Sequence, residues 1–120
     1  MNDCIFCKIR DGIIPSQKLY EDDLMFIIRD IAPVAKLHYL AIPKAHYKFL
    51  KDMTPQDSLN LGKCFFKIAE LADGLGLKNG FRIVINQGED GGQVIFHLHI
   101  HILGGEKMSN KSVFQLKSLD

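Results

Sequence analysis

Three histidines recur at every second position of one short apolar segment: His97, His99 and His101. Residues 97–103 alternate between polar and apolar, which is the period of a half-buried strand. Side chains alternate faces along a strand, so the three imidazoles would stand together on one face while the apolar residues pack on the core. With 5 His in 120 residues, this spacing would arise by chance in roughly one such chain in a hundred.

An imidazole in this setting can act as a nucleophile at neutral pH, because an unperturbed pKa near 6.5 leaves much of it uncharged. Such a group can attack phosphorus and form a phospho-histidine, which divides one hard displacement into two. His99 stands in the middle, and we predict that it forms this bond while its neighbours bind phosphate oxygens or shuttle protons. Two plainer interpretations stay open: a polar strand face that happens to use histidine, and a His-x-His metal site.

A glycine-bearing segment, residues 86–93, comes shortly before these histidines and combines three glycines with amide side chains. Glycine allows backbone N–H groups to approach an anion closely. Many tight turns share this composition, so the segment alone is weak evidence. Its position just ahead of three aligned histidines is what favours a phosphate-binding loop.

The spacing Cys4-x-x-Cys7 is half of a zinc site. A redox Cys-x-x-Cys motif is the main alternative, but no strand precedes the pair as a thioredoxin-like motif requires. Two small buried side chains are the third interpretation. We expect Cys64 to be packed inside a helix. Three cysteines do not indicate a disulfide framework, and we expect reduced thiols.

Hydrophobic periodicity and the helix-capping and turn residues predict the helices and strands that position these residues. Residues 4–10 predict a short helix, capped by Asp3 and ended by Gly12. A long helix should start after Thr54, bury Leu61, Phe65, Ile68, Ala69, Ala72 and Leu75, and end at Gly74 and Gly76. Strands are expected at residues 18–21, 24–29, 38–42, 81–86 and 97–103. This pattern predicts an α+β fold with an antiparallel sheet of about five strands, one long helix and a short N-terminal helix.

The composition narrows the function classes. A chain of 120 residues suits one domain over 1–120, with a core at about 3–105 and a C-terminal tail at 106–120. The net charge of +1 does not favour a nucleic-acid partner. The longest apolar run, Leu24–Ile28, is too short for a membrane span, and no basic leader precedes it, so we expect a cytoplasmic protein.

Taken together, these segments resemble the histidine triad (HIT) superfamily, in particular its Hint branch of purine nucleoside phosphoramidases. The resemblance covers roughly residues 3–105, and its most specific part is the His-x-His-x-His strand followed by Leu-Gly-Gly at 103–105. Supporting parts are Cys-Ile-Phe-Cys-Lys-Ile at 4–9, Tyr-Glu-Asp-Asp at 20–23, Asp-Ile-Ala-Pro at 30–33, Ile-Pro-Lys-Ala-His at 42–46, Asn-Gln-Gly at 86–88 and Gly-Gly-Gln at 91–93.

The resemblance implies a HIT-like fold and an enzyme that cleaves at the α-phosphorus of purine nucleoside 5′-monophosphate derivatives, such as phosphoramidates and acyl-adenylates. It implies a covalent nucleotidyl-histidine on His99 and a catalytic set completed by His38, His97 and His101. Nucleotide-binding positions carried over from the family, besides His99 and His101, are Phe6, Ile9, Asp30, Ile31, Asn86, Gly92, Gln93 and Val94. In that family Asp30 would hold the ribose hydroxyls, and Phe6, Ile9 and Ile31 the base.

The resemblance also supplies partners and a metal. It implies a homodimer, no organic cofactor, and a structural zinc ion completed by the histidine after Ile-Pro-Lys and by the first triad histidine. The expected ligands are therefore Cys4, Cys7, His46 and His97.

Two departures from the pattern leave the leaving group open. Val94 stands where Hint-like proteins usually carry Ser or Thr, and the chain after residue 105 has no tryptophan and no Pro-Pro-Gly ending. One alternative is a dinucleoside polyphosphate hydrolase of the same superfamily. The other is a nucleotide-binding or scaffold dimer with vestigial activity.

Overall fold

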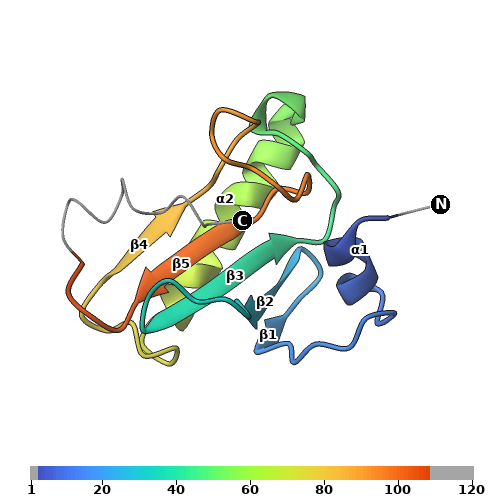
Figure 1. The fold of residues 1–120 in the computed structure, drawn as a ribbon. Helices are drawn as coiled ribbons and strands as arrows, with labels where there is room; N and C mark the ends of the chain where they lie inside the picture. Colours follow the sequence, from blue (N-terminus) through green and yellow to red (C-terminus); the bar gives the residue numbers. More distant parts are fainter. Residues whose placement is uncertain (1–2, 109–120) are drawn as a thin grey trace.

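The computed structural model describes residues 3–108, which form two α-helices, one 3-10 turn and five strands (Figure 1). In chain order these are α1 Ile5–Arg10, β1 Tyr20–Glu21, β2 Met25–Arg29, β3 Leu37–Pro43, η1 Leu50–Asp52, α2 Pro55–Leu71, β4 Phe81–Val84 and β5 Ile100–Gly104. The strands form one sheet in the order β1-β2-β3-β5-β4, with every neighbouring pair antiparallel. The predicted α+β class is confirmed. Most of the predicted tail, residues 109–120, lies outside the described residues.

The sheet separates two apolar clusters, because successive side chains on β2 and β3 point to opposite faces. One, the α2 cluster, includes Met25, Ile27, Tyr39, Ala41, Cys64, Ile68, Ile100 and Ile102. The other, the α1 cluster, contains Phe6, Ile9, Phe26, Ile28, Leu40 and Ile42. Each face of β2 is covered by one of these clusters, so β2 carries apolar side chains on both faces. The two helices divide the molecule into a large core on one side and a smaller apolar layer on the other.

The strand that carries the histidines is shorter than predicted. β5 begins at Ile100, which pairs with Ala41, and its partner β3 ends two residues later at Pro43. Residues 97–99 instead approach the loop after β3, where the Leu98 N–H donates to the Tyr47 carbonyl at 2.7 Å. The predicted start at residue 97 was wrong because residues 97–99 do not continue the pairing with β3 and contact the loop after it.

Two other strand boundaries also differ from the prediction. β4 stops at Val84, opposite His101, so the predicted strand 81–86 was too long. β1 is limited to residues 20–21, although the Leu19 N–H still donates to the Ile27 carbonyl at 2.7 Å.

The caps of the two helices test the local predictions separately. At α2, Thr54 and Asp57 form a reciprocal capping box with Pro55 in the first turn, as the sequence predicted. At α1 the cap is Cys4 and not Asp3, because the Cys4 Sγ accepts from the Cys7 N–H at 3.4 Å. The predicted burial of Ala69 was wrong, because this side chain lies on the exposed face of α2.

Helix α2 ends at Leu71, earlier than the predicted glycines. The turn continues to Gly76, which has a φ of +83°. Within residues 3–108, neither helix has the length and apolar character needed to cross a bilayer.

Candidate active site and metal site

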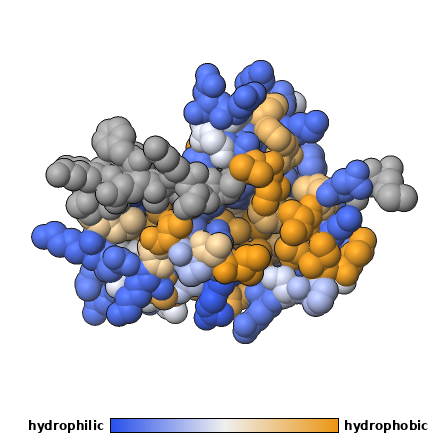
Figure 2. All heavy atoms as spheres, in the orientation of Figure 1, coloured by the Kyte–Doolittle hydropathy of each residue, from blue (hydrophilic) through white to orange (hydrophobic). Residues whose placement is uncertain are grey.

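A cavity of about 330 Å³ opens on the α1 side of the sheet. Its lining is mostly apolar and comes from Ile5, Phe6, Ile9, Ile14, Pro15, Ser16, Ile28, Arg29, Asp30, Ile31, Ala32, Leu40, Ile95, His99 and His101. Figure 2 shows the matching surface, where hydrophobic residues gather over α1 and toward the middle of the molecule with hydrophilic residues at the rim. A cavity of this size and polarity suits a small ligand with an apolar ring system.

The triad histidines are buried, with exposed fractions of 0% for His97, 4% for His99 and 1% for His101. The interpretation of a solvent-facing polar strand is therefore wrong. His99 and His101 line the cavity with their ring centroids 4.9 Å apart, while His97 turns toward the cysteines.

The proton on His99 is placed by the backbone. His99 Nδ1 lies 2.7 Å from the carbonyl oxygen of His97, and a carbonyl can only accept. Nδ1 of the neutral ring therefore carries the hydrogen, and the lone pair is on Nε2. Phe6 packs edge-on against this ring at a centroid distance of 4.9 Å. The ring is held in one orientation, and that hydrogen bond determines that the lone pair is on Nε2.

His38 from β3 completes a second group of polar atoms beside His101. The Val34 N–H donates to His38 Nδ1 at 3.2 Å, so the hydrogen of the neutral His38 ring is on Nε2. Nε2 lies 3.0 Å from His101 Nδ1 and 3.3 Å from the Asp30 carboxylate. Asp30, His38, His99 and His101 are candidate catalytic residues, and we call them the catalytic cluster.

The protonation state of His38 follows from its surroundings. Burial lowers the pKa of His38, the nearby Asp30 carboxylate raises it, and His101 lowers it again, with burial the largest cause. The net pKa is below the ordinary value of histidine. His38 is therefore neutral at pH 7 and can donate through Nε2.

A second polar cluster lies at the start of α1, and we call Cys4, Cys7, His46 and His97 the metal cluster. Their ligand atoms all lie within 4.8 Å of one another. Cys7 Sγ is 3.1 Å from His46 Nδ1, Cys4 Sγ is 3.3 Å from His97 Nδ1, and the two Nδ1 atoms are 3.1 Å apart. A tetrahedron with bonds of about 2.0–2.3 Å has ligand-to-ligand edges of about 3.3–3.8 Å. The observed separations of 3.1–3.6 Å are close to that range, so the four atoms could hold a zinc ion.

The outer nitrogen of His97 also fits a metal ligand. His97 Nε2 lies 2.7 Å from the Pro43 carbonyl oxygen, so Nε2 carries the hydrogen and the Nδ1 lone pair points at the cysteines. Burial lowers the pKa of His97 to about 4, which keeps the ring neutral. His46 is exposed and Cys4 is half-buried, so the cluster is open to solvent on one side.

The glycine-bearing loop places its predicted residues differently. Residue 91 must be glycine because an added Cβ would collide with the Gln87 carbonyl oxygen. The Gln93 side chain is used within the protein, where Oε1 accepts from the Gly88 N–H at 2.8 Å and Nε2 donates to the Lys48 carbonyl at 3.0 Å. Gln93 therefore shapes the loop, and its predicted contact with the nucleotide stays a prediction.

Of the predicted nucleotide-binding residues, the structure brings six to the cavity wall: Phe6, Ile9, Asp30, Ile31, His99 and His101. Asn86, Gly92, Gln93 and Val94 are not among the described residues that line it. Sequence reasoning missed Ile28, Leu40 and Ile95. The alternation of β2 and β3 could have assigned the first two to the face that carries the histidines.

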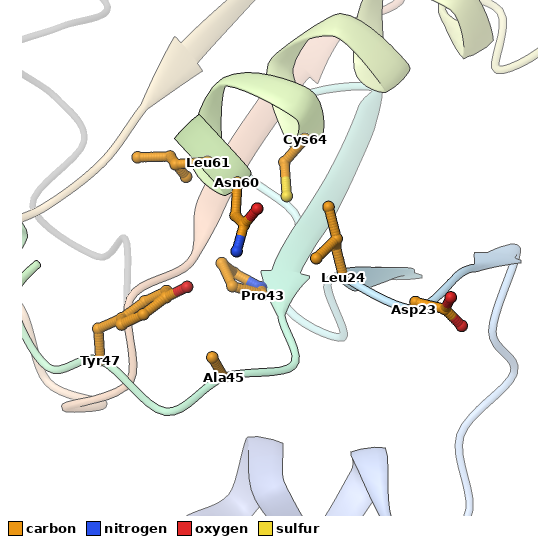
Figure 3. A pocket seen from close by; sticks show the side chains of 8 residues that line it. All are labelled: Asp23, Leu24, Pro43, Ala45, Tyr47, Asn60, Leu61 and Cys64. Atoms are coloured by element: carbon orange, nitrogen blue, oxygen red, sulfur yellow. The ribbon is translucent and has the colours of Figure 1, made fainter. Parts of the chain in front are cut away.

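A smaller cavity of about 70 Å³ lies between α2 and the end of β3, and Figure 3 shows its lining side chains. Cys64 from α2 points into it, and burial raises the pKa of this thiol to about 11. The side chain belongs to the α2 cluster, as expected for a packed cysteine. Cys64 therefore provides a matched control for the cysteines of the metal cluster.

Comparison with known proteins agrees with this geometry. Residues 11–108 match the HIT domain family. The chain is 49% identical to protein HitA of Neisseria gonorrhoeae over 104 residues. The aligned segment covers 87% of this chain and 97% of HitA.

Two solved structures share the fold. One is a HIT family hydrolase from Legionella pneumophila Philadelphia 1, with a TM-score of 0.85 and 39% identity, covering 90% of this chain and 97% of that one. The other is a zinc-bound histidine triad family protein from Mycobacterium smegmatis, with a TM-score of 0.75 and 33% identity, covering 97% of this chain and 91% of that one. The chain therefore belongs to the HIT domain family.

Proposed function

We propose that this protein is a hydrolase or nucleotidyl transferase that acts at the α-phosphorus of purine nucleoside 5′-monophosphate derivatives, including phosphoramidates and acyl-adenylates. The observation that carries the proposal is the hydrogen bond of 2.7 Å between His99 Nδ1 and the His97 carbonyl. This bond fixes the tautomer in which Nδ1 carries the hydrogen and Nε2 has the lone pair, in a ring that lines a mostly apolar cavity. A neutral imidazole prepared in this way is suited to nucleophilic attack on phosphorus.

The reaction takes two balanced steps. In the first, His99 Nε2 forms a bond to the α-phosphorus while the bond from phosphorus to the leaving group breaks, and the leaving group takes a proton. In the second, water attacks the phosphorus, the bond to His99 breaks, and the nucleoside monophosphate is released. Phe6, Ile9 and Ile31 would contact the base, and Asp30 the ribose hydroxyls.

The catalytic cluster provides a route for the proton. His38 Nε2–H donates to His101 Nδ1, so the hydrogen of a neutral His101 ring is on its Nε2. This nitrogen would donate to the leaving group and later take the proton of the attacking water. Asp30, 3.3 Å from His38 Nε2, stabilises any positive charge that His38 gains.

The decisive experiment compares two substrates. We expect turnover of adenosine 5′-phosphoramidate, with release of AMP, to exceed that of diadenosine polyphosphate. The reverse preference would indicate a dinucleoside polyphosphate hydrolase. Binding of AMP without turnover of either would indicate a nucleotide-binding protein.

The metal cluster is proposed to bind one structural zinc ion through Cys4, Cys7, His46 and His97. The support is the convergence of four ligand atoms within 4.8 Å and the hydrogen bond that directs the His97 Nδ1 lone pair toward them. With four protein ligands, zinc has no open position and supplies structural stabilisation, not chemistry.

We also propose a homodimer. A single chain of this size buries a limited core, and Leu59 and Phe66 on the outer face of α2 are 63% and 67% exposed. Such side chains at helical spacing favour a partner surface. Light scattering at micromolar concentration should give the dimer mass, and Phe66→Glu should lower it. A monomer mass for the unaltered protein would overturn this assignment.

A further inference from the structure

Helix α1 has only six residues, Ile5–Arg10, and a helix this short is not stable by itself. Side chains at both ends hold it in place. Cys4 and Cys7 belong to the metal cluster, and Arg10 Nη1 donates to the Lys44 carbonyl at 2.7 Å. Two of the side chains that hold α1 in place therefore belong to the metal cluster.

The same helix is a wall of the cavity. Ile5, Phe6 and Ile9 all line it, and Phe6 and Ile9 are buried in the α1 cluster. None of these residues belongs to the α2 cluster, which forms the larger core on the other face of the sheet. Displacement of α1 would open the cavity and leave the α2 cluster in place.

Two contacts connect the metal cluster to His99. The Phe6 ring lies edge-on to His97, at a centroid distance of 5.8 Å, and to His99, at 4.9 Å. His97 itself faces the cysteines through Nδ1 and accepts from His99 Nδ1–H through its carbonyl. A shift of His97 or of α1 would therefore move the ring that we propose as the nucleophile.

The arrangement of these atoms suits a bound cation. The Nδ1 atoms of His46 and His97 face each other at 3.1 Å, and the hydrogen of His97 is on the opposite nitrogen. Two thiols lie against the same atoms. A divalent cation between them would be bound by all four atoms in place of these hydrogen-bond contacts.

We propose that the metal cluster controls nucleotide affinity, because metal binding holds α1 against the cavity and sets the position of His99 through Phe6 and His97. The metal-free protein would keep the α2 cluster but lose the wall that contacts the nucleoside. The identity of the ligand rests on the proposed function.

The test measures binding of AMP and not turnover. Zinc-loaded protein, protein stripped with a chelator, and stripped protein reloaded with zinc are compared by calorimetry. We expect the affinity for AMP to fall at least tenfold on stripping and to return on reloading. Hydrogen exchange should rise in residues 5–10 on stripping and stay unchanged in residues 64–71 of α2.

Matched variants separate the metal from the wall. Cys7→Ser should reproduce the stripped state, and Cys64→Ser should retain both zinc and AMP affinity. Phe6→Ala should retain zinc and still lose AMP affinity at least tenfold, which tests the wall even where Cys7→Ser fails to fold.

The outcomes distinguish this inference from the proposed function. Unchanged AMP affinity after complete stripping would overturn the inference and leave the function intact. If zinc-loaded protein binds no AMP, the proposed nucleotide function fails. In that case the exchange data decide the link between metal and helix, and unchanged exchange in residues 5–10 would overturn it as well.

Discussion

The metal cluster and the catalytic cluster each contain a histidine whose tautomer is fixed by the backbone, but the two tautomers are opposite. In the metal cluster, His97 Nε2–H donates to the Pro43 carbonyl, so its lone pair points inward toward the cysteines. In the catalytic cluster, His38 Nδ1 accepts from the Val34 N–H, so its hydrogen points inward toward His101 and Asp30. When a backbone carbonyl accepts from one ring nitrogen, the other nitrogen has a lone pair and can bind a metal. When a backbone N–H donates to one ring nitrogen, the other nitrogen carries the hydrogen and can donate it.

This difference matters because Asp30, His38 and His101 are also close enough to hold a metal ion, with ligand atoms within 4.8 Å of one another. A metal at His38 Nε2 would force the hydrogen onto Nδ1, against the Val34 N–H. The backbone therefore favours a metal at one cluster and proton transfer at the other. His99, whose Nδ1–H donates to a carbonyl, presents a lone pair as His97 does, but it presents it to the cavity.

The largest expected effect tests the lone pair of His99. His99→Ala should lower turnover of adenosine 5′-phosphoramidate by about 10³-fold or more, because no other group replaces the bond to phosphorus. Affinity for AMP should change by less than about tenfold, since the wall formed by Ile9 and Ile31 remains. Steady-state rates and calorimetry on the same preparation measure both. A variant that keeps normal turnover would remove His99 as nucleophile.

The next prediction tests whether only one cluster takes a metal. Purified protein prepared without chelators should carry about one zinc per chain. Cys7→Ser should reduce this toward zero and lower the melting temperature by about 10 °C or more, as expected for a loss of a few kcal/mol. His38→Asn should leave the zinc content unchanged. Two zinc ions per chain by elemental analysis would break the comparison, and zinc-free protein would remove the proposed site.

The third prediction concerns the proton on His38. Because its pKa is lowered in the folded state, mainly by burial, the unfolded chain binds more protons below about pH 6.5. Stability contributed by neutral His38 is therefore present above that pH and is lost as the pH falls through the window below it. The facing ionisable groups, Asp30 and His101, are kept in His38→Asn. Thermal unfolding between pH 7 and pH 5 should show a smaller loss for His38→Asn than for the unaltered protein, and equal losses would contradict the assignment.

The sequence predicted the large features of the fold because they follow from hydrophobic periodicity and from residues that begin or end helices and strands. The alternation through residues 98–102 assigned the apolar side chains correctly, and Thr54 and Pro55 marked the start of α2. Strand ends were less accurate because they depend on tertiary contacts: β5 begins at Ile100, and before it the Leu98 N–H donates to the Tyr47 carbonyl in the loop after β3. The cap of α1 by Cys4 depends on a sulfur contact that helix statistics do not contain.

The site shows the same division. Spacing alone selected His97, His99 and His101, and Cys4 and Cys7 of the metal cluster, as candidate site residues. Period and spacing could not show that Phe6, Asp30 and Ile31 meet at one cavity, because these residues are brought together only by the packing of α1 on the sheet; the family resemblance was needed to assign them. The tautomer of His97 is set by the Pro43 carbonyl, 54 residues away in the chain. Those of His38 and His99 are set by the nearby backbone groups of Val34 and His97, but they depend on a backbone conformation that residue spacing does not specify.

The smallest expected effect concerns Val94, where the Hint-like pattern usually has a hydroxyl. Val94 is 68% exposed in the loop before the triad, and its side chain has no hydrogen-bond donor. The hydrogen bond from His38 to His101 is proposed as the main route of the leaving-group proton. If so, an added hydroxyl at residue 94 should raise the rate most when the leaving group is a poor one. A general-acid contribution is worth about 10²–10⁴-fold when it is lost completely, and His101 or water replaces part of it, so we expect Val94→Ser to raise the rate on an alkyl phosphoramidate by about tenfold. The rate on an acyl-adenylate, whose leaving group needs no proton, should change much less. Equal changes on both substrates, or lower rates, would show that residue 94 has no part in proton transfer and that valine is a packing choice.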